Sequence, residues 1–379
     1  MKRWGVLAGL VLARLAWGMQ YQSVASAGPE LSARFGLDYA ALGTLVGTFM
    51  AAGIALSLPW GLLGRWRGER AAGSLGLLLM LAGGGMVALA AGVPGIGWGR
   101  VVAGAGGVAV VVMQGKMVSD RFAGPAFLPA MGLVLGGFPV GVGLAGLFAA
   151  PFGWAGLTWL CAAPAVLAFV LVAVCADAAP HRSRLSFPTW RECALVAAAA
   201  LVWTAYNGAY YAFLAYMPSV VAGRGGSAAL AALVVAVGTW SNLPASVLAG
   251  WAASRVGAGR VFLVGTLVTA GSMAALWLTP FLVVPSVLFG TLGGMHAGVM
   301  VGLGTRSTRP ENQAVGMGIF YTIYYAGSAG LPALCGHVAD AMGDPGAALG
   351  AGAALSLLCL PFWGLHRVLR RPKPAPVPA

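Results

Sequence analysis

Residues 261–305 read VFLVGTLVTAGSMAALWLTPFLVVPSVLFGTLGGMHAGVMVGLGT, and this run decides the class of fold. It contains no Asp, Glu, Lys or Arg, and His296 is its one side chain that titrates near neutral pH. A helix needs about 20 apolar residues to cross a bilayer, so the run is too long for one span. Pro280 and Pro285 mark the expected return. The run therefore predicts two membrane-spanning helices joined by a short turn.

The same apolar character extends over the whole chain. Hydrophobic residues make up 59% of its 379 residues and charged residues only 8%, and the mean hydropathy is +0.86. A soluble protein of this length cannot hide that much apolar surface, so its surroundings must be a lipid bilayer. The 59 glycines allow helices to approach closely. The net charge of +13 is spread over short connections, which does not indicate a nucleic-acid partner.

Apolar runs of spanning length recur between short polar connections. The sequence therefore predicts an all-α integral membrane protein with 12 transmembrane helices. The expected spans are 4–27, 39–62, 71–92, 96–118, 125–150, 154–176, 193–218, 227–252, 260–282, 284–305, 313–337 and 345–366.

The basic residues predict the orientation of these spans. If the N-terminus is cytoplasmic, the connections on that side carry 18 of the 22 Lys and Arg residues. The other four are Arg14, Arg34, Arg100 and Arg224. An excess of Lys and Arg marks cytoplasmic loops, so we expect both termini to be cytoplasmic in a bacterial-type inner (plasma) membrane.

The polar segment DAAPHRSRLSFPTWRE divides the chain into two halves. We expect an N-terminal six-helix bundle at 1–176, a cytoplasmic linker at 177–192, and a C-terminal six-helix bundle with a short basic, proline-rich tail at 193–379. An offset of 189 residues relates special positions of the two halves, as in membrane proteins built from parallel repeats. The proline pair is expected to end the first span of each half, and the glycine pairs to flank matching turns. The pairs are Pro29 with Pro218, Gly61 with Gly250, Gly68 with Gly257, and Gly104 with Gly293.

Three motifs carry a resemblance to a known family. The turn after the second span, Gly61-Leu-Leu-Gly-Arg-Trp-Arg-Gly68-Glu-Arg70, is similar to the pattern G-x-L-a-D-R-x-G-R-R. A weaker echo, Gly250-Trp-Ala-Ala-Ser-Arg255-Val-Gly257-Ala-Gly-Arg260, follows the eighth span, and Arg100-Val-Val-Ala-Gly104-Ala-Gly106 matches R-x-x-x-G-x-G. With the six-plus-six layout, these motifs resemble the major facilitator superfamily (MFS) over nearly the whole chain. The resemblance implies a secondary transporter with two bundles that rock around a central cavity.

The chain departs from the family pattern in its loop motif. The usual acidic residue is replaced by Arg65 in the first half and by Ser254 in the second. The resemblance implies that this acid helps to latch the two bundles. The fifth span also lacks the Gly-Pro pair of drug/proton antiporters, whereas residues 23–31 and 309–318 look more like the cyanate/nitroimidazole-type carriers.

Arg14 is the first candidate for substrate binding, because it lies near the middle of the first span. A cation at that depth costs at least about 2.5–3.5 kcal/mol. No Asp or Glu lies at a comparable depth elsewhere, so we expect the partner of Arg14 to arrive as a ligand. A guanidinium binds a carboxylate or an inorganic oxyanion bidentately. The structural alternative is that Arg14 bonds helix carbonyls or extends towards an interface.

Aromatic and amide residues of the first, seventh and eleventh spans are further candidates. Helical spacing groups the seventh-span candidates on one face and sets Tyr321 beside Tyr324 and Tyr325. Aromatic walls with a few polar groups suit a small-molecule site, although helix packing is the alternative. An interfacial aromatic belt is the alternative for Gln22, Tyr211 and Tyr216. The expected substrate-binding residues are Arg14, Trp17, Gln20, Tyr206, Asn207, Tyr210, Tyr321 and Tyr324.

His296 and His337 are the candidates for proton coupling, because imidazole titrates near neutral pH. The alternative is that each is a hydrogen-bonded structural residue. Uniport, anion exchange and symport with the proton on His or on the substrate all fit a chain without midspan carboxylates.

The chemical motifs of enzymes are missing from the sequence. It contains no H-E-x-x-H, no P-loop and no C-x-x-C pair among its five cysteines. We therefore expect no enzymatic activity, no cofactor and no metal site. The hypothesis is a monomeric secondary transporter of a small anionic solute. The alternatives are an exporter of neutral or amphipathic compounds and a membrane-embedded enzyme or sensor.

Overall fold

The structure is a computed structural model that describes residues 2–176, 186–296, 300, 303–304 and 306–370. Within these ranges the chain forms helices and no strands, which confirms the all-α prediction. Most of the predicted linker, parts of the tenth span (297–299, 301–302 and 305) and the tail at 371–379 lie outside the described residues.

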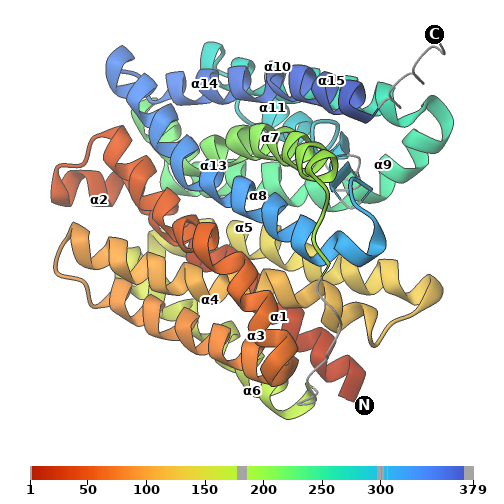
Figure 1. The fold of residues 1–379 in the computed structure, drawn as a ribbon. Helices are drawn as coiled ribbons and strands as arrows, with labels where there is room; N and C mark the ends of the chain where they lie inside the picture. Colours follow the sequence, from red (N-terminus) through yellow and green to blue (C-terminus); the bar gives the residue numbers. More distant parts are fainter. Residues whose placement is uncertain (1, 177–185, 297–299, 301–302, 305, 371–379) are drawn as a thin grey trace, which may run out of the picture.

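The helices fall into two groups that lie one above the other in Figure 1. The first group comprises α1 (Lys2–Ser26), α2 (Gly28–Phe35), α3 (Tyr39–Ala88), α4 (Val93–Ser119), η1 (Gly124–Ala126), α5 (Phe127–Leu160) and α6 (Ala162–Cys175). The second group comprises α7 (Trp190–Gly223), α8 (Ala228–Trp240), α9 (Asn242–Val256), α10 (Ala258–Leu278), α11 (Val283–Gly290), η2 (Gly294–His296), η3 (Pro310–Asn312), α13 (Gln313–Met342), α14 (Gly346–Leu357) and α15 (Cys359–Arg370). We call these groups the first and the second half.

Eight helical segments of the described chain are long and apolar enough to span a membrane. α1 and α13, with 25 and 30 residues, are not among these eight. Both carry polar or tyrosine side chains that lower their hydropathy, and most residues of α1 are buried inside the molecule. The return predicted near Pro280 is confirmed, since α10 ends at Leu278 and α11 begins at Val283. The helix order therefore follows the predicted spans.

Two related glycines make the tight turns of the loop motifs. α3 is a pair of helices that meet at Gly68, with φ 85° and ψ 165°. Gly257 joins α9 to α10 with φ 88° and ψ 141°. L-residues with a side chain rarely adopt such positive φ values, so glycine is the residue that fits. Gly68 and Gly257 are one of the pairs at the 189-residue offset, and the two halves therefore share this turn.

Pro218 does not end the seventh span, so this prediction is wrong. α7 continues through Pro218 to Gly223, whereas Pro29 lies in the first turn of α2. A proline inside a helix leaves the carbonyl four residues earlier without its N–H donor. Here that carbonyl belongs to Leu214, and the side chain of Gln22 donates to it at 3.0 Å. Gln22 of the first half thus satisfies the carbonyl that Pro218 leaves without a donor in the second half.

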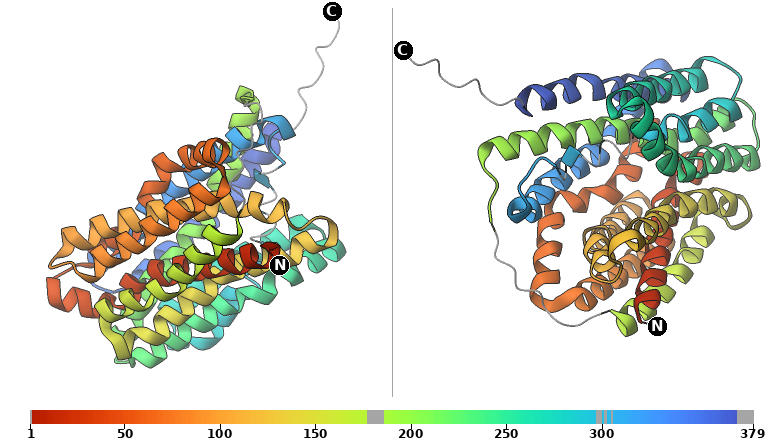
Figure 2. Two further views of the ribbon diagram at one scale, coloured as in Figure 1. Left: turned by 90° about the horizontal axis from the view of Figure 1, so that it is seen from below. Right: turned by 90° about the vertical axis from the view of Figure 1, so that its right-hand side faces the viewer.

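α1 begins and α15 ends on one side of the molecule, which we call the terminal face (Figures 1 and 2). The opposite side, where α1 ends and α3 begins, is the far face. The halves meet along two helix pairs, α3 with α13 and α5 with α8. Gly47 of α3 lies so close to the Ala329 carbonyl of α13 that a Cβ would overlap it. Small residues therefore allow the two backbones to touch.

Hydrogen bonds join the halves at the far face. The Asp340 carboxylate of α13 accepts from the backbone N–H groups of Tyr39 and Ala40, at 2.9 and 2.8 Å, in the first turn of α3. A carboxylate at a helix N-terminus also interacts favourably with the helix dipole. The hydroxyl of Tyr216 lies 2.9 Å from the Tyr39 carbonyl and 2.6 Å from the Pro332 carbonyl. We call Asp340, Tyr216 and the start of α3 the far-face latch.

Asp340→Ala should shift the protein towards conformations that are open at the far face. Hydrogen bonds that involve a charged group contribute about 1.5–3 kcal/mol, enough to change a population ratio by roughly tenfold or more. Spin labels at Ala33 and Met342, in a background without native cysteines, would measure the separation of the halves. Asp344→Asn is the matched control, because Asp344 bonds Trp277 and Gly346 within the second half. An unchanged distance distribution in Asp340→Ala would show that the latch does not hold this face closed.

Candidate functional site

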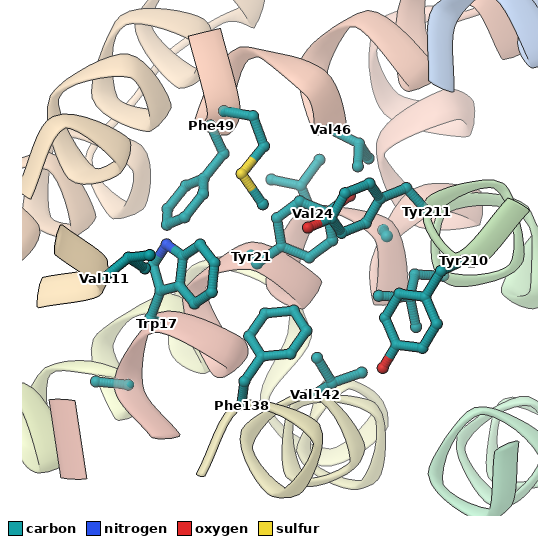
Figure 3. Close-up of a cluster of buried hydrophobic side chains, with 14 of the residues drawn as sticks. Trp17, Tyr21, Val24, Val46, Phe49, Val111, Phe138, Val142, Tyr210 and Tyr211 are labelled. Carbon is teal, nitrogen blue, oxygen red and sulfur yellow. The ribbon is translucent and has the colours of Figure 1, made fainter. Parts of the chain in front are cut away.

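Arg14 lies midway along α1, inside the molecule, with 8% of its surface exposed. Glycines of neighbouring helices make room for this part of α1. The indole of Trp17 lies directly on Gly107 of α4, and a Cβ at Gly137 of α5 would be 3.0 Å from the Cβ of Arg14. The guanidinium carbon lies 4.5 Å from the centroid of the Trp17 ring and 5.5 Å from that of Phe138. Figure 3 shows Trp17 and Phe138 side by side in this region.

No hydrogen bond or ion pair joins Arg14 to any residue that the structure describes, and its Nε is buried without a partner. Cation–π contacts are its remaining stabilisation, at about 2 kcal/mol each when desolvated. Removing a cation from water costs several kcal/mol, and a ring face satisfies none of the N–H donors. The guanidinium is therefore under-compensated in the described part of the protein.

Arg100 shows how this fold satisfies a buried arginine. It is 1% exposed, and its guanidinium donates to four backbone carbonyls of α1 and α3 at 2.6–3.2 Å. Gly104 explains the R-x-x-x-G spacing, because it lies one turn later and packs directly against the Phe49 carbonyl. The close approach of α4 to α3 brings Arg100 within reach of the carbonyls of Leu45 and Val46. Arg100 therefore bonds helix carbonyls, which was the structural alternative considered for Arg14.

Arg100→Ala should destabilise the protein, while Arg14→Ala should not. Loss of the Arg100 bonds should cost about 2–3 kcal/mol, the scale of a hydrogen bond to a charged group. Arg14→Ala removes a buried cation without a hydrogen-bond partner, so stability should be unchanged or higher. Thermal unfolding of the two purified variants in one detergent measures the difference. Equal losses of stability would mean that both arginines are structural.

Tyrosines of the second half face Arg14 across the interface. The hydroxyls of Tyr211 of α7 and Tyr324 of α13 are hydrogen-bonded to each other. Both tyrosines, with Tyr321 and Tyr325, lie within electrostatic range of the guanidinium. The ring centroids of Tyr324 and Tyr325 are 4.9 Å apart. The site therefore draws its cation from the first half and these four hydroxyls from the second.

Tyr21 completes the contact between the halves. It follows Arg14 by seven residues and so lies on the same face of α1. Its ring centroid is 5.1 Å from that of Tyr211 and 6.1 Å from that of Phe138. Figure 3 shows the three rings next to one another. We call this group the central aromatic site. Its members are Arg14, Trp17, Tyr21, Phe138, Tyr211, Tyr321, Tyr324 and Tyr325.

The structure does not bring all predicted binding residues to this site. Gln20 lies on another side of α1 and donates to the Met80 carbonyl of the first half at 3.1 Å. Asn207 donates to the Trp203 carbonyl, one turn earlier in α7, at 2.8 Å. Tyr210 lies at the edge of the site, with its ring stacked 6.0 Å from Phe289 of α11.

Tyr206 and the two histidines lie away from Arg14. Tyr206 contacts Trp203 at 5.7 Å and His296 at 4.8 Å between ring centroids, inside the second half. His296 is fully buried there and also faces Phe262. His337 is exposed on α13. A role of either histidine in proton coupling stays a prediction.

The interfacial belt proposed for Gln22, Tyr211 and Tyr216 is wrong. These residues are 0%, 2% and 0% exposed, and all three hydrogen-bond across the interface or within the second half. A belt residue must reach the lipid headgroups, whereas these side chains lie between the halves. Hydropathy cannot distinguish the headgroup region from the interface between the halves, because both suit amphipathic side chains.

The loop motif holds its own half together in this structure. The family's acidic position is Arg65, but Glu69 lies four residues later and is buried. It accepts from Lys116 at 3.1 Å and from Arg121 at 2.9 Å at the end of α4. Arg70 donates to the Ala176 carbonyl at the end of α6 at 2.9 Å. Sequence reasoning missed this role of Glu69, although the residue is inside the quoted motif.

The remaining motif residues lie within helices. Gly61 belongs to the first part of α3, and Gly250 and Arg255 belong to α9. The guanidinium of Arg255 lies 4.6 Å from the Trp251 ring centroid. These residues lie in the helices that lead to the turns at Gly68 and Gly257.

A cavity of about 250 Å³ lies at the far face where the halves meet. Ser26 and Glu30 line it together with Pro218 of α7, and small residues of α5 and α8 complete its wall. Sequence reasoning did not predict this cavity. It is separate from Arg14, which is not among its lining residues.

Solved structures of transporters share this fold. A bacterial homolog of the human lysosomal transporter Spinster, in an inward-facing and unoccupied conformation, superposes with a TM-score of 0.74 at 16% identity, covering 97% of both chains. A point mutant of the nucleoside transporter NupG gives 0.74 at 12% identity, covering 97% of this chain and 98% of that one. No curated protein matches the sequence. The sequence pattern of the Major Facilitator Superfamily matches residues 6–332 and, in a second match, 204–379, so this chain of membrane-spanning helices belongs to the Major Facilitator Superfamily of transporters.

Proposed function

We propose that this transporter moves a small anionic solute by alternating access, and that Arg14 binds the anion. The observation that carries the proposal is the buried guanidinium without a hydrogen-bond partner or a counter-ion among the described residues. An anion would supply both. Its contacts would reach Arg14 in the first half and tyrosines in the second, so binding would favour conformations in which the halves approach each other.

The proposal includes an orientation. The helix ends set Arg67, Arg70, Arg121, Arg260 and Arg367 at the terminal face. Because Lys and Arg mark cytoplasmic loops, we propose that this face is cytoplasmic in a bacterial inner membrane. The protein would then act as a monomer, in which the bundles at 1–176 and 193–379 move relative to each other.

Anion-dependent stabilisation tests the proposal. A ligand at 100 times its Kd raises the free energy of unfolding by about 2.7 kcal/mol when it binds only the folded state. Thermal unfolding of wild type and Arg14→Ala would be compared across inorganic and organic anions. We expect at least one anion to stabilise wild type and not the variant. Stabilisation that survives in Arg14→Ala would contradict the role of Arg14.

A negative result leads to the alternative function. If no anion stabilises wild type and neutral or amphipathic compounds do, the aromatic walls would be the binding surface. The chain would then be an exporter of such compounds, and Arg14 would be structural.

A further inference from the structure

We propose that the central aromatic site selects monovalent anions with at least two acceptor atoms, and that Tyr325 is one of its hydrogen-bond donors. This inference rests on the proposed function, in which Arg14 binds the anion. It adds a charge limit, a hydrogen-bonding requirement and a specificity residue in the second half.

The charge limit follows from the cations in this region. Arg14 is the one Lys or Arg side chain in the central aromatic site as the structure describes it. Arg100, the other deeply buried arginine, already donates to four carbonyls of its own half. A second negative charge on the ligand would therefore be buried without a counter-charge, at a cost of several kcal/mol. The site therefore favours ligands that carry one negative charge.

The hydrogen-bonding requirement follows from the free donors. Arg14 Nε and the hydroxyls of Tyr21 and Tyr325 are buried without a hydrogen-bond partner in the described structure. In the Tyr211–Tyr324 pair, one hydroxyl donates to the other, and the accepting hydroxyl keeps its own O–H. All four groups can donate, and no carboxylate of the described residues forms an ion pair here. A ligand with two or more acceptor oxygens or nitrogens satisfies more of these donors than one with a single acceptor.

Tyr325 is held in place by the first half although it belongs to the second. Its ring lies against Gly53 of α3, where a Cβ would be 2.5 Å or closer to ring carbons. The side chain is 0% exposed, and it lies within electrostatic range of Arg14. An anion on Arg14 could therefore also accept from Tyr325 and so join the halves.

Matched pairs of anions test the charge limit. Binding to wild type would be measured by calorimetry at neutral pH for formate with oxalate, acetate with malonate, and nitrate with sulfate. In at least one of these pairs, we expect the monovalent anion to bind at least about tenfold more tightly than the divalent anion. We also expect this binding to be lost in Arg14→Ala.

Tyr325→Phe tests the specificity residue. Removing one hydrogen bond to a charged group should weaken binding of the monovalent anion by about tenfold or more, with the ring packing kept. Tyr39→Phe is the control, because the latch uses only its backbone. Unchanged affinity in Tyr325→Phe would overturn the role of Tyr325.

The outcomes separate the two proposals. Tighter binding of divalent anions that still depends on Arg14 would overturn the charge limit and leave the proposed function standing. Anion binding that survives in Arg14→Ala, or no anion binding at all, would overturn the proposed function itself.

Discussion

Arg14→Ala should reduce anion flux in proteoliposomes to about 1% of the wild-type rate or less, because loss of a charge-assisted bidentate contact costs about 3 kcal/mol or more on the usual scale. Arg14→Lys should retain a fraction of the flux, since lysine keeps the charge and loses the planar fork of donors. Uptake of the anion that stabilises wild type most strongly is the measurement.

Arg34→Ala is the matched control for this variant. Arg34 also belongs to the first half and also lies near aromatic rings, 5.4 Å from Phe35 and 5.9 Å from Trp154. It is exposed at the far face, so its removal should leave flux near the wild-type rate. Near-normal flux in Arg14→Ala would show that the anion binds elsewhere.

Gly47→Leu should abolish transport through a different cause. A side chain at Gly47 would overlap the Ala329 backbone of α13, so the two halves could not meet at the far face. Packed interfaces do not tolerate such overlap without moving apart. Each half should still fold, because Gly47 faces the other half. Spin labels at Ala33 and Met342 should report a far face that stays open.

Gly330→Leu is the control for this crowding. Gly330 follows Ala329 directly, yet no heavy atom lies within 4 Å of the position that its Cβ would take. Transport and label distances should therefore match wild type. If Gly47→Leu also transports normally, closure of α3 on α13 is not part of the transport cycle.

The sequence predicted the parts of the fold that depend on hydropathy and backbone conformation. Apolar runs predicted the helix order, and the paired glycines at 68 and 257 predicted matching turns. The buried charge of Arg14 was equally visible, because a midspan cation is costly wherever the rest of the chain lies. These features depend on single residues and their neighbours in sequence.

Features that depend on the second half could not be predicted from local spacing. The helix continues through Pro218 because Gln22 of α1 satisfies the freed carbonyl of Leu214. Tyr211 and Tyr325 belong to the central site because α7 and α13 meet α1 and α3 there. Tyr21 was not among the predicted residues, although its position seven residues after Arg14, on the same helix face, would have been sufficient to predict it.

The most direct test of Arg14 as the anion site is a crystal structure with bound perrhenate, located by the anomalous scattering of its rhenium. Perrhenate is a monovalent anion with four acceptor oxygens, so it meets both requirements of the proposed site. We expect a peak in contact with the Arg14 guanidinium, on the side of Tyr324 and Tyr325, and its loss in crystals of Arg14→Ala. A peak only in the far-face cavity, or one that remains at the centre without Arg14, would contradict this role of Arg14.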